Sequence, residues 1–536
     1  MKDKEPPQDL LDWMGVKNAP NWVGARSFGR LIGTLLVVAV PALFVGSLIA
    51  AFVVLWHTVD LAINGEGGAI NLGAGALITA LLGAPFLIWS TVLKHQTVRY
   101  QKEGHITDRI NKAVEQLGAE KSVKRDDKET TEPNIEVRIG AILSLERIAQ
   151  DSTRYDKGRD HVRVMEILCA YVRENSNARA PRDFPLAEWE PLKDDATKAE
   201  RKAHEMWREV RFRDRYNANA REWAASLPKP RADIAQTLQV LGRRTADQRR
   251  VEAAWPNPPE KETVWPFDVP CPELSEVEGD DARTSAEIES FKEKLVAWRD
   301  RLRDYSGYRL DLRGANLQGA DLSAKRPDAS NAVFSGAIMQ SSRLEGADLS
   351  GARLEGIELQ HSRMEGVFLK EARIEAAEFI TARMEGVNLT GARMRSADFS
   401  DVKMEASDMR FARMEEANFR WARMECADLT YARMSGAGLS AARLSCANLS
   451  NARMDRRTEL LATSFNHVVL RNASYSDVDI SANQVSTAFG DASVSLPIGV
   501  KRPAHWPRWE LDYGSFRREY RKWRANPDAY TPPPQP

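Results

Sequence analysis

The stretch SRMEGVFLKEARIEAAEFITARMEG, Ser362–Gly386, combines two periods. A small residue followed two positions later by a large apolar one recurs every five residues, whereas arginine recurs every ten, at Arg363, Arg373 and Arg383. An α-helix has 3.6 residues per turn, so it would scatter a five-residue period around its whole surface. A solenoid of short strands with a corner in each unit keeps the apolar residues pointing inward.

The repeat covers a long part of the chain. It begins at LDLRGANLQGADLSA (residues 310–324) and is interrupted by KRPDASN (residues 325–331). From Phe334 to Met454 it runs without a break, which at five residues a unit gives 25 units. After Met454 the register slips by one residue, and we place the end of the solenoid near residue 490.

The identities of the central apolar residues indicate how many units form one turn. Phenylalanine recurs 20 residues apart at Phe379, Phe399 and Phe419. Methionine recurs in the same way at Met364, Met384, Met404 and Met424. Identical residues that stack in one column would produce this spacing, so we predict four units per turn.

Alternate units carry Arg before the central residue and Glu after it, as in Arg343 with Glu345 and Arg353 with Glu355. Both flanks of an inward residue on a strand point outward. We therefore expect exposed Arg and Glu columns on two opposite faces, where each exposed pair is worth about 0–1 kcal/mol. The other two faces carry Asp348, Glu358, Asn388, Asp398, Asp408, Asn418 and Asp428.

These units resemble the A(D/N)LxX repeats of the pentapeptide-repeat family over residues 310–480. The resemblance implies a right-handed quadrilateral β-helix. The upstream segments VRIGAILSLERIA, DHVRVMEIL and PRADIAQTLQVLGRR resemble those of membrane-anchored bacterial members, which have no settled activity. Some members of the family protect DNA gyrase by imitating the anionic surface of DNA. Here the Arg columns interrupt such a surface, and the whole chain has a net charge of zero, so we expect no nucleic-acid partner.

Two uncharged runs precede the repeats, at residues 31–56 and 67–93. About 20 apolar residues span a bilayer as a helix, so we predict two transmembrane helices joined by a short loop, residues 57–66. Basic residues lie before the first run (Arg26 and Arg30) and after the second (Lys94), and none lies in the loop. Positive charge stays on the cytoplasmic side, so we expect both termini, including residues 1–30, in the cytoplasm of a cell inner membrane.

Residues 95–262 read as a helical cytoplasmic region. Residues 106–117 and two stretches within 135–175 have helical apolar spacing, whereas 180–262 suggests a solvated helix with one weakly buried face. Asp160 and His161 are adjacent and could form a catalytic pair, but we expect Asp160 to cap the second helix. Prolines mark residues 263–283 as a linker, and residues 284–304 are predicted to form a helix that caps the solenoid.

The tail, residues 500–536, is basic and aromatic, with Phe516, Tyr520 and Trp523 on one helical face. Such a segment could bind anionic lipid or a partner protein. We favour a cap that protects the strand edges at the end of the β-helix, predicted at residues 310–490.

The fold predicted is multi-domain: a two-helix transmembrane hairpin, an α-helical middle region and a quadrilateral β-helix. The four cysteines form no CxxC pair, and we identify no catalytic, cofactor-binding or metal-binding residue. We expect a non-enzymatic membrane-anchored scaffold that binds an unknown cytoplasmic protein and could form a homo-oligomer. The alternative is a membrane effector or sensor, for example in phage defence, whose spans act on the membrane when the soluble part is triggered. An enzyme within residues 95–260 is a third, less favoured class.

Overall fold

The computed structural model describes residues 42, 45–57, 59–60, 63–64, 106–125, 128–184, 192–193, 195–213, 216–273, 285–324 and 332–535. The chain divides into two compact units, Met1–Asp108 and Arg109–Pro536. In the first unit, residue 42 and residues 45–57 are helical. No helix within the described ranges is both long and apolar enough to cross a membrane. The predicted second span, 67–93, the N-terminal segment 1–30 and most of residues 31–44 lie outside the described residues.

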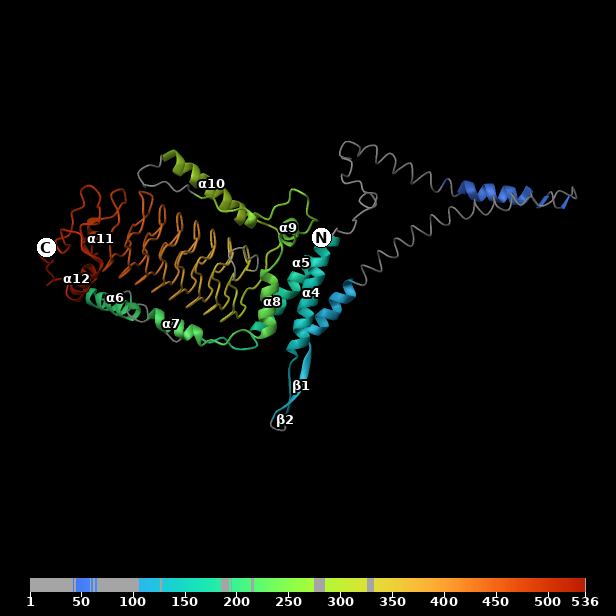
Figure 1. Ribbon diagram of the computed structural model, residues 1–536, viewed down its shortest axis with the longest axis horizontal. Coiled ribbons are helices and arrows are strands. Elements are labelled where there is room, and N and C mark those ends of the chain that lie inside the picture. Colours follow the sequence, from blue (N-terminus) through green and yellow to red (C-terminus); the bar gives the residue numbers. More distant parts are fainter. Residues whose placement is uncertain are drawn as a thin grey trace, which may run out of the picture. The chain divides into compact units, whose positions relative to one another are not determined.

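The second unit combines helices with a long stack of short β-bridges (Figure 1). Its elements are β1 (Glu120–Arg125), β2 (Lys128–Pro133), α4 (Ile135–Tyr155), α5 (His161–Ser176), α6 (Lys198–Arg213), α7 (Tyr216–Ala225), α8 (Ala232–Gly242), α9 (Ala246–Ala254), the 3-10 helix η2 (Pro266–Asp268), α10 (Ser285–Arg303), α11 (Ala482–Ser486) and α12 (Tyr513–Ala525).

The helices α4, α5, α8 and α9 pack together at the start of the repeats (Figure 1). The predicted helices at 106–117, α4 and α5 are confirmed. The side chain of Asn134 caps α4 by accepting a hydrogen bond from the amide of Val137, and Ile142 and Leu145 are fully buried. The prediction that residues 180–262 form a solvated, weakly buried helix is wrong for α8. Leu238 and Leu241 of this helix are buried in the core between α4 and the first coil.

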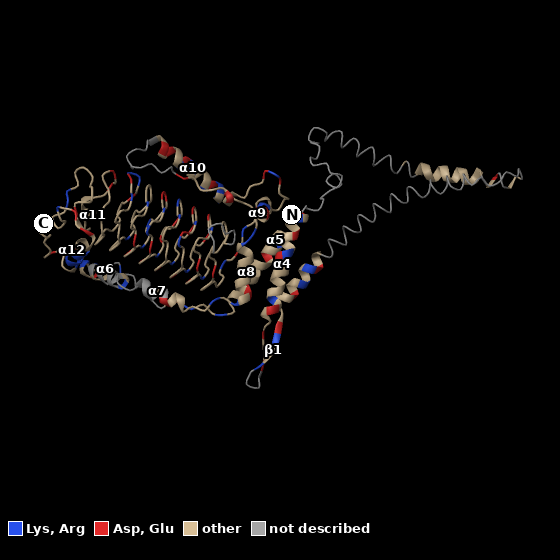
Figure 2. Cartoon of the chain, in the orientation of Figure 1, with Lys and Arg blue, Asp and Glu red and all other residues tan. Residues whose placement is uncertain are grey.

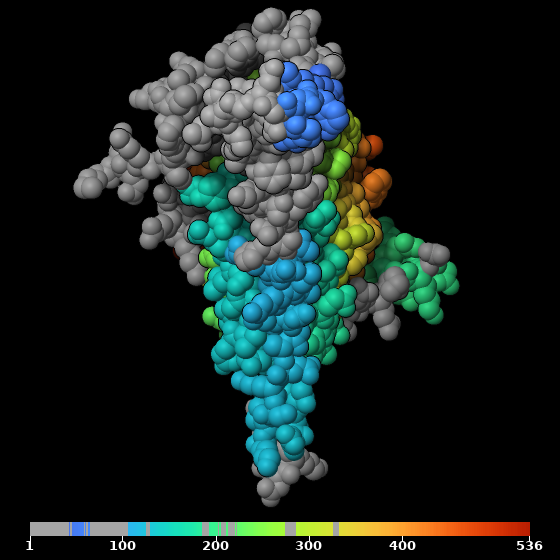
Figure 3. Space-filling view, turned by 90° about the vertical axis from the view of Figure 1, so that its right-hand side faces the viewer, coloured from blue at the N-terminus to red at the C-terminus, as the bar shows by residue number. Residues whose placement is uncertain are grey.

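The antiparallel hairpin β1–β2 was not predicted. It pairs Val123 with Thr130 and continues to Glu120 with Pro133. In Figure 3 it projects as a narrow tip beyond the helices. Its strands are rich in charged residues and lack the alternation of apolar and polar residues that would have identified them.

The repeats form a solenoid with four units per turn, as predicted. Parallel bridges join residues 20 apart, for example Arg363 with Arg383. The rings of Phe379, Phe399 and Phe419 stack with centroids 4.7 and 5.0 Å apart. The interruption at 325–331 adds seven residues to one turn, so Asp311 pairs with Ile338, and the later register slip is confirmed because Gly438 pairs with Glu459.

A corner residue with positive φ follows each short strand and defines the four edges of the solenoid. Edge 1 consists of Gly346, Gly366, Gly386, Ala406, Cys426 and Cys446. Edge 2 consists of Gly351, Glu371, Gly391, Phe411, Tyr431 and Asn451. Edge 3 consists of Gly336, Gly356, Ala376, Ser396, Glu416 and Gly436. Edge 4 consists of Ser341, His361, Thr381, Asp401, Trp421 and Ala441. Since successive units follow one another around the square, edges 1 and 3 are diagonally opposite, as are edges 2 and 4.

The tail caps the far end of the solenoid, which is the interpretation that the sequence analysis favoured. Gly490 occupies the inward position that follows Leu470 in its column, and a Cβ on Gly490 would lie 2.7 Å from the indole of Trp506. Trp506 is 1% exposed and donates its indole N–H to the carbonyl of Ala488. Helix α12, which appears blue with basic residues in Figure 2, buries Phe516 and Trp523 against Phe489.

Candidate functional site

The Arg and Glu columns form continuous ladders on two faces of the solenoid. On the face before edge 1, Arg363 contacts Glu365 of its own coil at 3.2 Å and Glu345 of the preceding coil at 3.5 Å. Arg383 likewise contacts Glu365 at 3.2 Å and Glu385 at 3.1 Å. Glu345 and Glu365 are therefore each held between guanidinium groups of two successive coils, whereas the coil after Glu385 carries Lys403 in the same column.

The Glu columns are buried, so the prediction of exposed Arg–Glu pairs is wrong. Glu345, Glu355, Glu365 and Glu375 are 0% exposed. The physical reason is their place in the unit, because each Glu lies in the turn immediately before a corner residue rather than in the strand. Segments that cover the corner therefore also cover the carboxylate.

Edge 1 is covered by residues 181–184 together with α6 and α7, which Figure 1 shows along one side of the solenoid. A Cβ added to Gly346 would lie 2.9 Å from the carbonyl oxygen of Ala224, and Ala406 packs with Phe184 and Ala220. This edge contains only Gly, Ala and Cys. The small-residue column was a sequence signal for a packed segment, and the sequence analysis missed it.

Edge 3 is covered by residues 264–273, here called the strap, and by α10. A Cβ on Gly356 would lie 2.7 Å from the ring of Phe267, and Trp265, Phe267 and Leu302 are buried in one cluster. The strap lies within the stretch expected to be a linker. Helix α10 runs beside the solenoid in Figure 1 rather than across its end as predicted, because its apolar stripe packs on the strap and edge 3.

Acidic residues of the covering segments bind the Arg columns. Asp183 contacts Arg343 at 3.0 Å and Arg363 at 2.7 Å, and this lowers the pKa of its carboxyl group. In the strap, Asp268 contacts Arg353 at 2.9 Å. The strap residue Glu273 lies 3.0 Å from Arg393, 3.6 Å from Arg395 and 3.8 Å from Arg413.

Arg395 stands where its column would otherwise carry glutamate, and Glu273 supplies the carboxylate from outside. Together these contacts show that the Arg columns accept carboxylates in an extended segment.

Burial changes the protonation of the enclosed carboxyl groups. Desolvation raises the pKa of Glu365 to about 7, with the nearby Glu385 and Glu345 adding to the rise and Arg383 and Arg363 opposing it. Desolvation likewise raises the pKa of Glu375 to about 7, with a further contribution from Glu355. The two covered edges therefore contain carboxyl groups that change charge near neutral pH.

Edges 2 and 4 carry large exposed aromatic residues. On edge 2, Phe411 is 56% exposed and Tyr431 is 50% exposed, and their rings stack at 5.1 Å with an angle of 3° between their planes. On edge 4, Trp421 is 62% exposed, between Asp401 and Ala441 in its column. These residues sit on the regular β-bridge ladder, which holds their backbone in place.

His161 does not form a catalytic pair with Asp160. Its Nε2 lies 2.9 Å from Glu252, which Arg244 also contacts at 2.9 Å. None of these three side chains is more than 2% exposed, so they form a buried polar network, which includes the Arg244–Glu252 ion pair, at the junction with the repeats. The capping prediction is also wrong in detail, because Asp160 holds the N-cap position of α5 without a side-chain capping bond.

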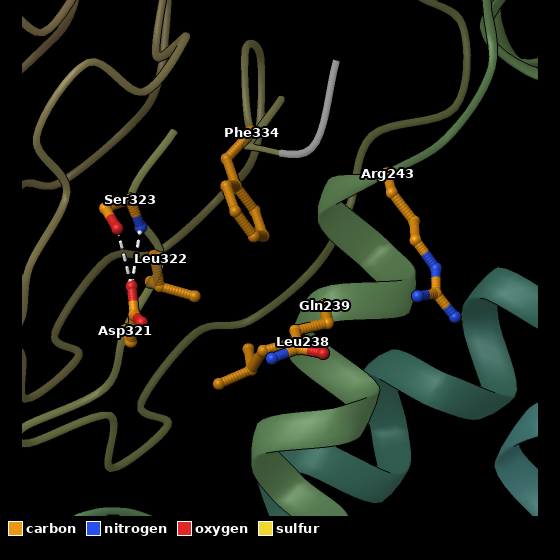
Figure 4. Close-up of a pocket in the computed structure, with 7 residues that line it drawn as sticks. All are labelled: Leu238, Gln239, Arg243, Asp321, Leu322, Ser323 and Phe334. Atoms are coloured by element: carbon orange, nitrogen blue, oxygen red, sulfur yellow. Dashed lines mark hydrogen bonds between the residues drawn. The ribbon is translucent and has the colours of Figure 1, made fainter. Parts of the chain in front are cut away.

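Two small cavities lie where the helices meet the first coils. One, of about 180 Å³, is lined by Leu238, Gln239, Arg243, Asp321, Leu322, Ser323 and Phe334 (Figure 4). Its charged groups are already engaged, since Arg243 contacts Glu146 at 2.5 Å and Asp321 accepts hydrogen bonds from Ser323. The other, of about 280 Å³, lies between α5, residues 228–231 and Asn316 and Gln318 of the repeats. The same contact recurs within the repeats between Ser400 and Asp398, so the Ser323–Asp321 pair is a local turn contact of the solenoid.

Cysteines and other metal-binding side chains are dispersed. Within the described ranges, no group of three or more His, Cys, Asp or Glu residues is placed to hold a metal ion. Burial raises the pKa of Cys169 to about 11 and that of Cys271 to about 12, so both thiols stay protonated at neutral pH. Cys426 and Cys446 follow one another on edge 1 and are half-buried.

The geometry defines a quadrilateral β-helix built from five-residue units. Residues 330–366, 352–391, 382–420 and 422–456 match the family model described as Pentapeptide repeats, in eight copies. Residues 330–456 therefore match the pentapeptide-repeat family, and they are joined to a helical region. A comparison with curated proteins finds no match.

Several solved structures are similar to part of the chain. The chain is similar to HetL, a pentapeptide repeat protein involved in heterocyst differentiation regulation from the cyanobacterium Nostoc sp. strain PCC 7120, with 20% identity, 38% of this chain and 91% of that chain covered, and a TM-score of 0.30. It is similar to Rfr23, a pentapeptide repeat protein from the cyanobacterium Cyanothece 51142, with 20% identity and a TM-score of 0.21. The similarity covers 21% of this chain and 90% of that chain. It is also similar to QnrB1, a plasmid-mediated fluoroquinolone resistance protein, with 16% identity and a TM-score of 0.20. The similarity covers 40% of this chain and 98% of that chain. At such identities and scores these similarities carry no argument about function.

Proposed function

We propose that this chain is a non-enzymatic, membrane-anchored scaffold whose β-helix binds a protein partner in the cytoplasm. The observation that carries the proposal is the division of the solenoid's edges. Edges 1 and 3 are covered by the chain's own segments, whereas edges 2 and 4 present exposed aromatic side chains on a rigid ladder. Exposed aromatic residues on a rigid surface are typical anchors of protein interfaces.

Anchoring is proposed from the two uncharged runs at 31–56 and 67–93 and from the basic residues that flank them. This arrangement would hold the second unit at the cytoplasmic face of the inner membrane. A two-dimensional surface raises the local concentration of a scaffold and its partner, which favours weak, reversible contacts. The proposal leaves room for self-association of the anchored chains.

Site-specific photo-crosslinking in intact cells tests this function with the full chain. A crosslinking amino acid is placed at Glu371 on edge 2, at Ala441 on edge 4, and at the exposed Val137 of α4 as a control. The scaffold function predicts a discrete protein adduct from an uncovered edge and none from α4. If neither edge gives an adduct at native expression, the β-helix is not the binding surface.

A further inference from the structure

We propose that edge 2 binds an acidic, extended segment of a protein partner, through the aromatic pair Phe411 and Tyr431 and the Arg column beside it. This inference rests on the proposed scaffold function and names the surface and the chemistry of its partner. The surface, here called the aromatic edge, comprises Phe411, Tyr431, Arg413, Arg433 and Arg453.

In each of two successive coils, an aromatic side chain and an Arg side chain lie two residues apart. Within each unit the corner residue is followed by an inward Ala and then by an outward Arg, as in Phe411-Ala412-Arg413 and Tyr431-Ala432-Arg433. Successive coils lie about 4.8 Å apart, which places the two aromatic rings beside a parallel column of guanidinium groups. The last Arg of the column, Arg453, is exposed and forms no ion pair within the described part of the chain.

Nothing in the fold requires aromatic residues at these corners. Phe411 has φ 60° and Tyr431 has φ 61°, in the left-handed region that glycine adopts without strain. A residue with a side chain held there strains the backbone. Edge 2 also contains Gly351 and Gly391, so glycine serves at equivalent corners. Both rings remain at least half exposed and thus gain little from burial in the chain itself.

The chemistry of the partner follows from what the same column already binds. Glu273 of the strap approaches Arg393, Arg395 and Arg413 with one carboxylate oxygen. Residues 269–273 around it have no regular secondary structure. The column continues beyond Glu273 to Arg433 and Arg453. A partner segment that carries carboxylates along an extended backbone would meet this column of guanidinium groups, and an apolar side chain between the carboxylates would pack on the two rings.

The experiment measures fluorescence anisotropy with the purified full chain in detergent. The probe is a fluorescein-labelled synthetic peptide of alternating glutamate and leucine, and the control peptide carries lysine in place of glutamate. The variants are F411A/Y431A, F411G/Y431G and R453E, with W421A as the matched control because Trp421 is a similarly exposed aromatic residue on edge 4. The glycine variant protects the test against misfolding, since glycine tolerates positive φ.

We expect the acidic peptide alone to bind, and its affinity to fall about tenfold or more in both double variants. R453E should also weaken binding, whereas W421A should stay within about twofold of the parent. Salt at about 1 M, where the Debye length is about 3 Å, should weaken binding further. Equal binding of both peptides, equal losses in W421A and F411A/Y431A, or no binding at about 1 mM peptide would overturn the proposal.

Failure of this proposal and failure of the scaffold function can be told apart in the cell. A crosslinking amino acid at Asn451, the next corner of edge 2, should give the same adduct as one at Glu371, and this adduct should be absent from F411A/R453E. An adduct from Ala441 alone would keep the scaffold function and refute the aromatic edge. The absence of any adduct from both edges would refute both.

Discussion

Replacement of Phe399 by alanine should open a cavity in the middle of the solenoid and destabilise the coils around it. The Phe399 ring is 0% exposed, and it stacks on Phe379 at 4.7 Å and on Phe419 at 5.0 Å. Truncation of a buried Phe to Ala costs about 3–5 kcal/mol through lost transfer energy and an unfilled cavity. Each lost stacked pair is worth a further 0.5–1.5 kcal/mol or so, which places the expected loss near the upper end, about 5 kcal/mol.

Native-state hydrogen exchange measures this loss where it occurs, because solenoids open locally rather than as one unit. The reporter amides are those of Phe379 and Phe399, which donate at 2.7 Å to the carbonyls of Asp398 and Asn418. At about 1.4 kcal/mol per tenfold change, the exchange of these amides should accelerate by roughly two to four orders of magnitude.

The matched control is Phe411→Ala, which removes the same side chain from an exposed corner of the same solenoid. It removes one exposed stacked pair, with Tyr431, and opens no cavity, so it should change the stability by about 1.5 kcal/mol or less. If Phe399→Ala accelerated exchange less than about tenfold, or no more than Phe411→Ala did, the Phe column would not contribute substantially to the stability of the solenoid.

Three further outcomes are expected. Because the pKa of Glu365 is raised to about 7 in the folded chain, the folded state binds more protons than the unfolded one at intermediate pH. The free energy of unfolding, measured by denaturant titration, should therefore fall as the pH rises from about 4.5 to about 7. Glu365→Gln should make this fall smaller. If the dependence of the free energy of unfolding on pH were unchanged in this variant, the raised pKa of Glu365 would be contradicted. Mild oxidation should link Cys426 to Cys446, whose backbones lie about 4.8 Å apart, within the range of about 4.4–6.8 Å for disulfides. Mass spectrometry should find that peptide and leave Cys169 and Cys271 unmodified, and any other pairing of Cys426 in the native protein would contradict the register. Protease added to inside-out vesicles should digest the region after Lys94, and resistance there would show that the predicted orientation is wrong.

The period of the sequence was enough to predict the solenoid and its register. Identical residues at Phe379, Phe399 and Phe419 revealed four units per turn, and the seven extra residues at 325–331 appear as one longer turn. The prediction succeeds because each unit contacts only its neighbours, so the spacing of residues along the sequence determines which residues stack. The slip after Met454 was readable for the same reason.

The covering segments could not be located in this way, because they contact the solenoid over long distances in sequence. Residues 198–213 are so rich in charge that their apolar positions read as a solvated face, and the prolines around Trp265 and Phe267 suggested a linker. Signals were nevertheless present. A column made only of Gly, Ala and Cys along edge 1 indicates close contact, and two aromatic residues within a proline-rich stretch indicate burial.

The ten-residue period of arginine can now be assigned a structural meaning. In a four-sided solenoid of five-residue units, a feature repeated every ten residues falls on two opposite faces and is absent from the other two. Those two faces carry the Arg–Glu ladders, and their edges are covered by residues 181–184 with α6 and α7 on one side and by the strap with α10 on the other. The arginines bind carboxylates from both coverings, through Asp183, Asp268 and Glu273. The chain thus uses one half of its surface to bind its own segments. The remaining edges expose large aromatic side chains, Phe411 and Tyr431 on one and Trp421 on the other, and for this reason the proposed partner is placed there.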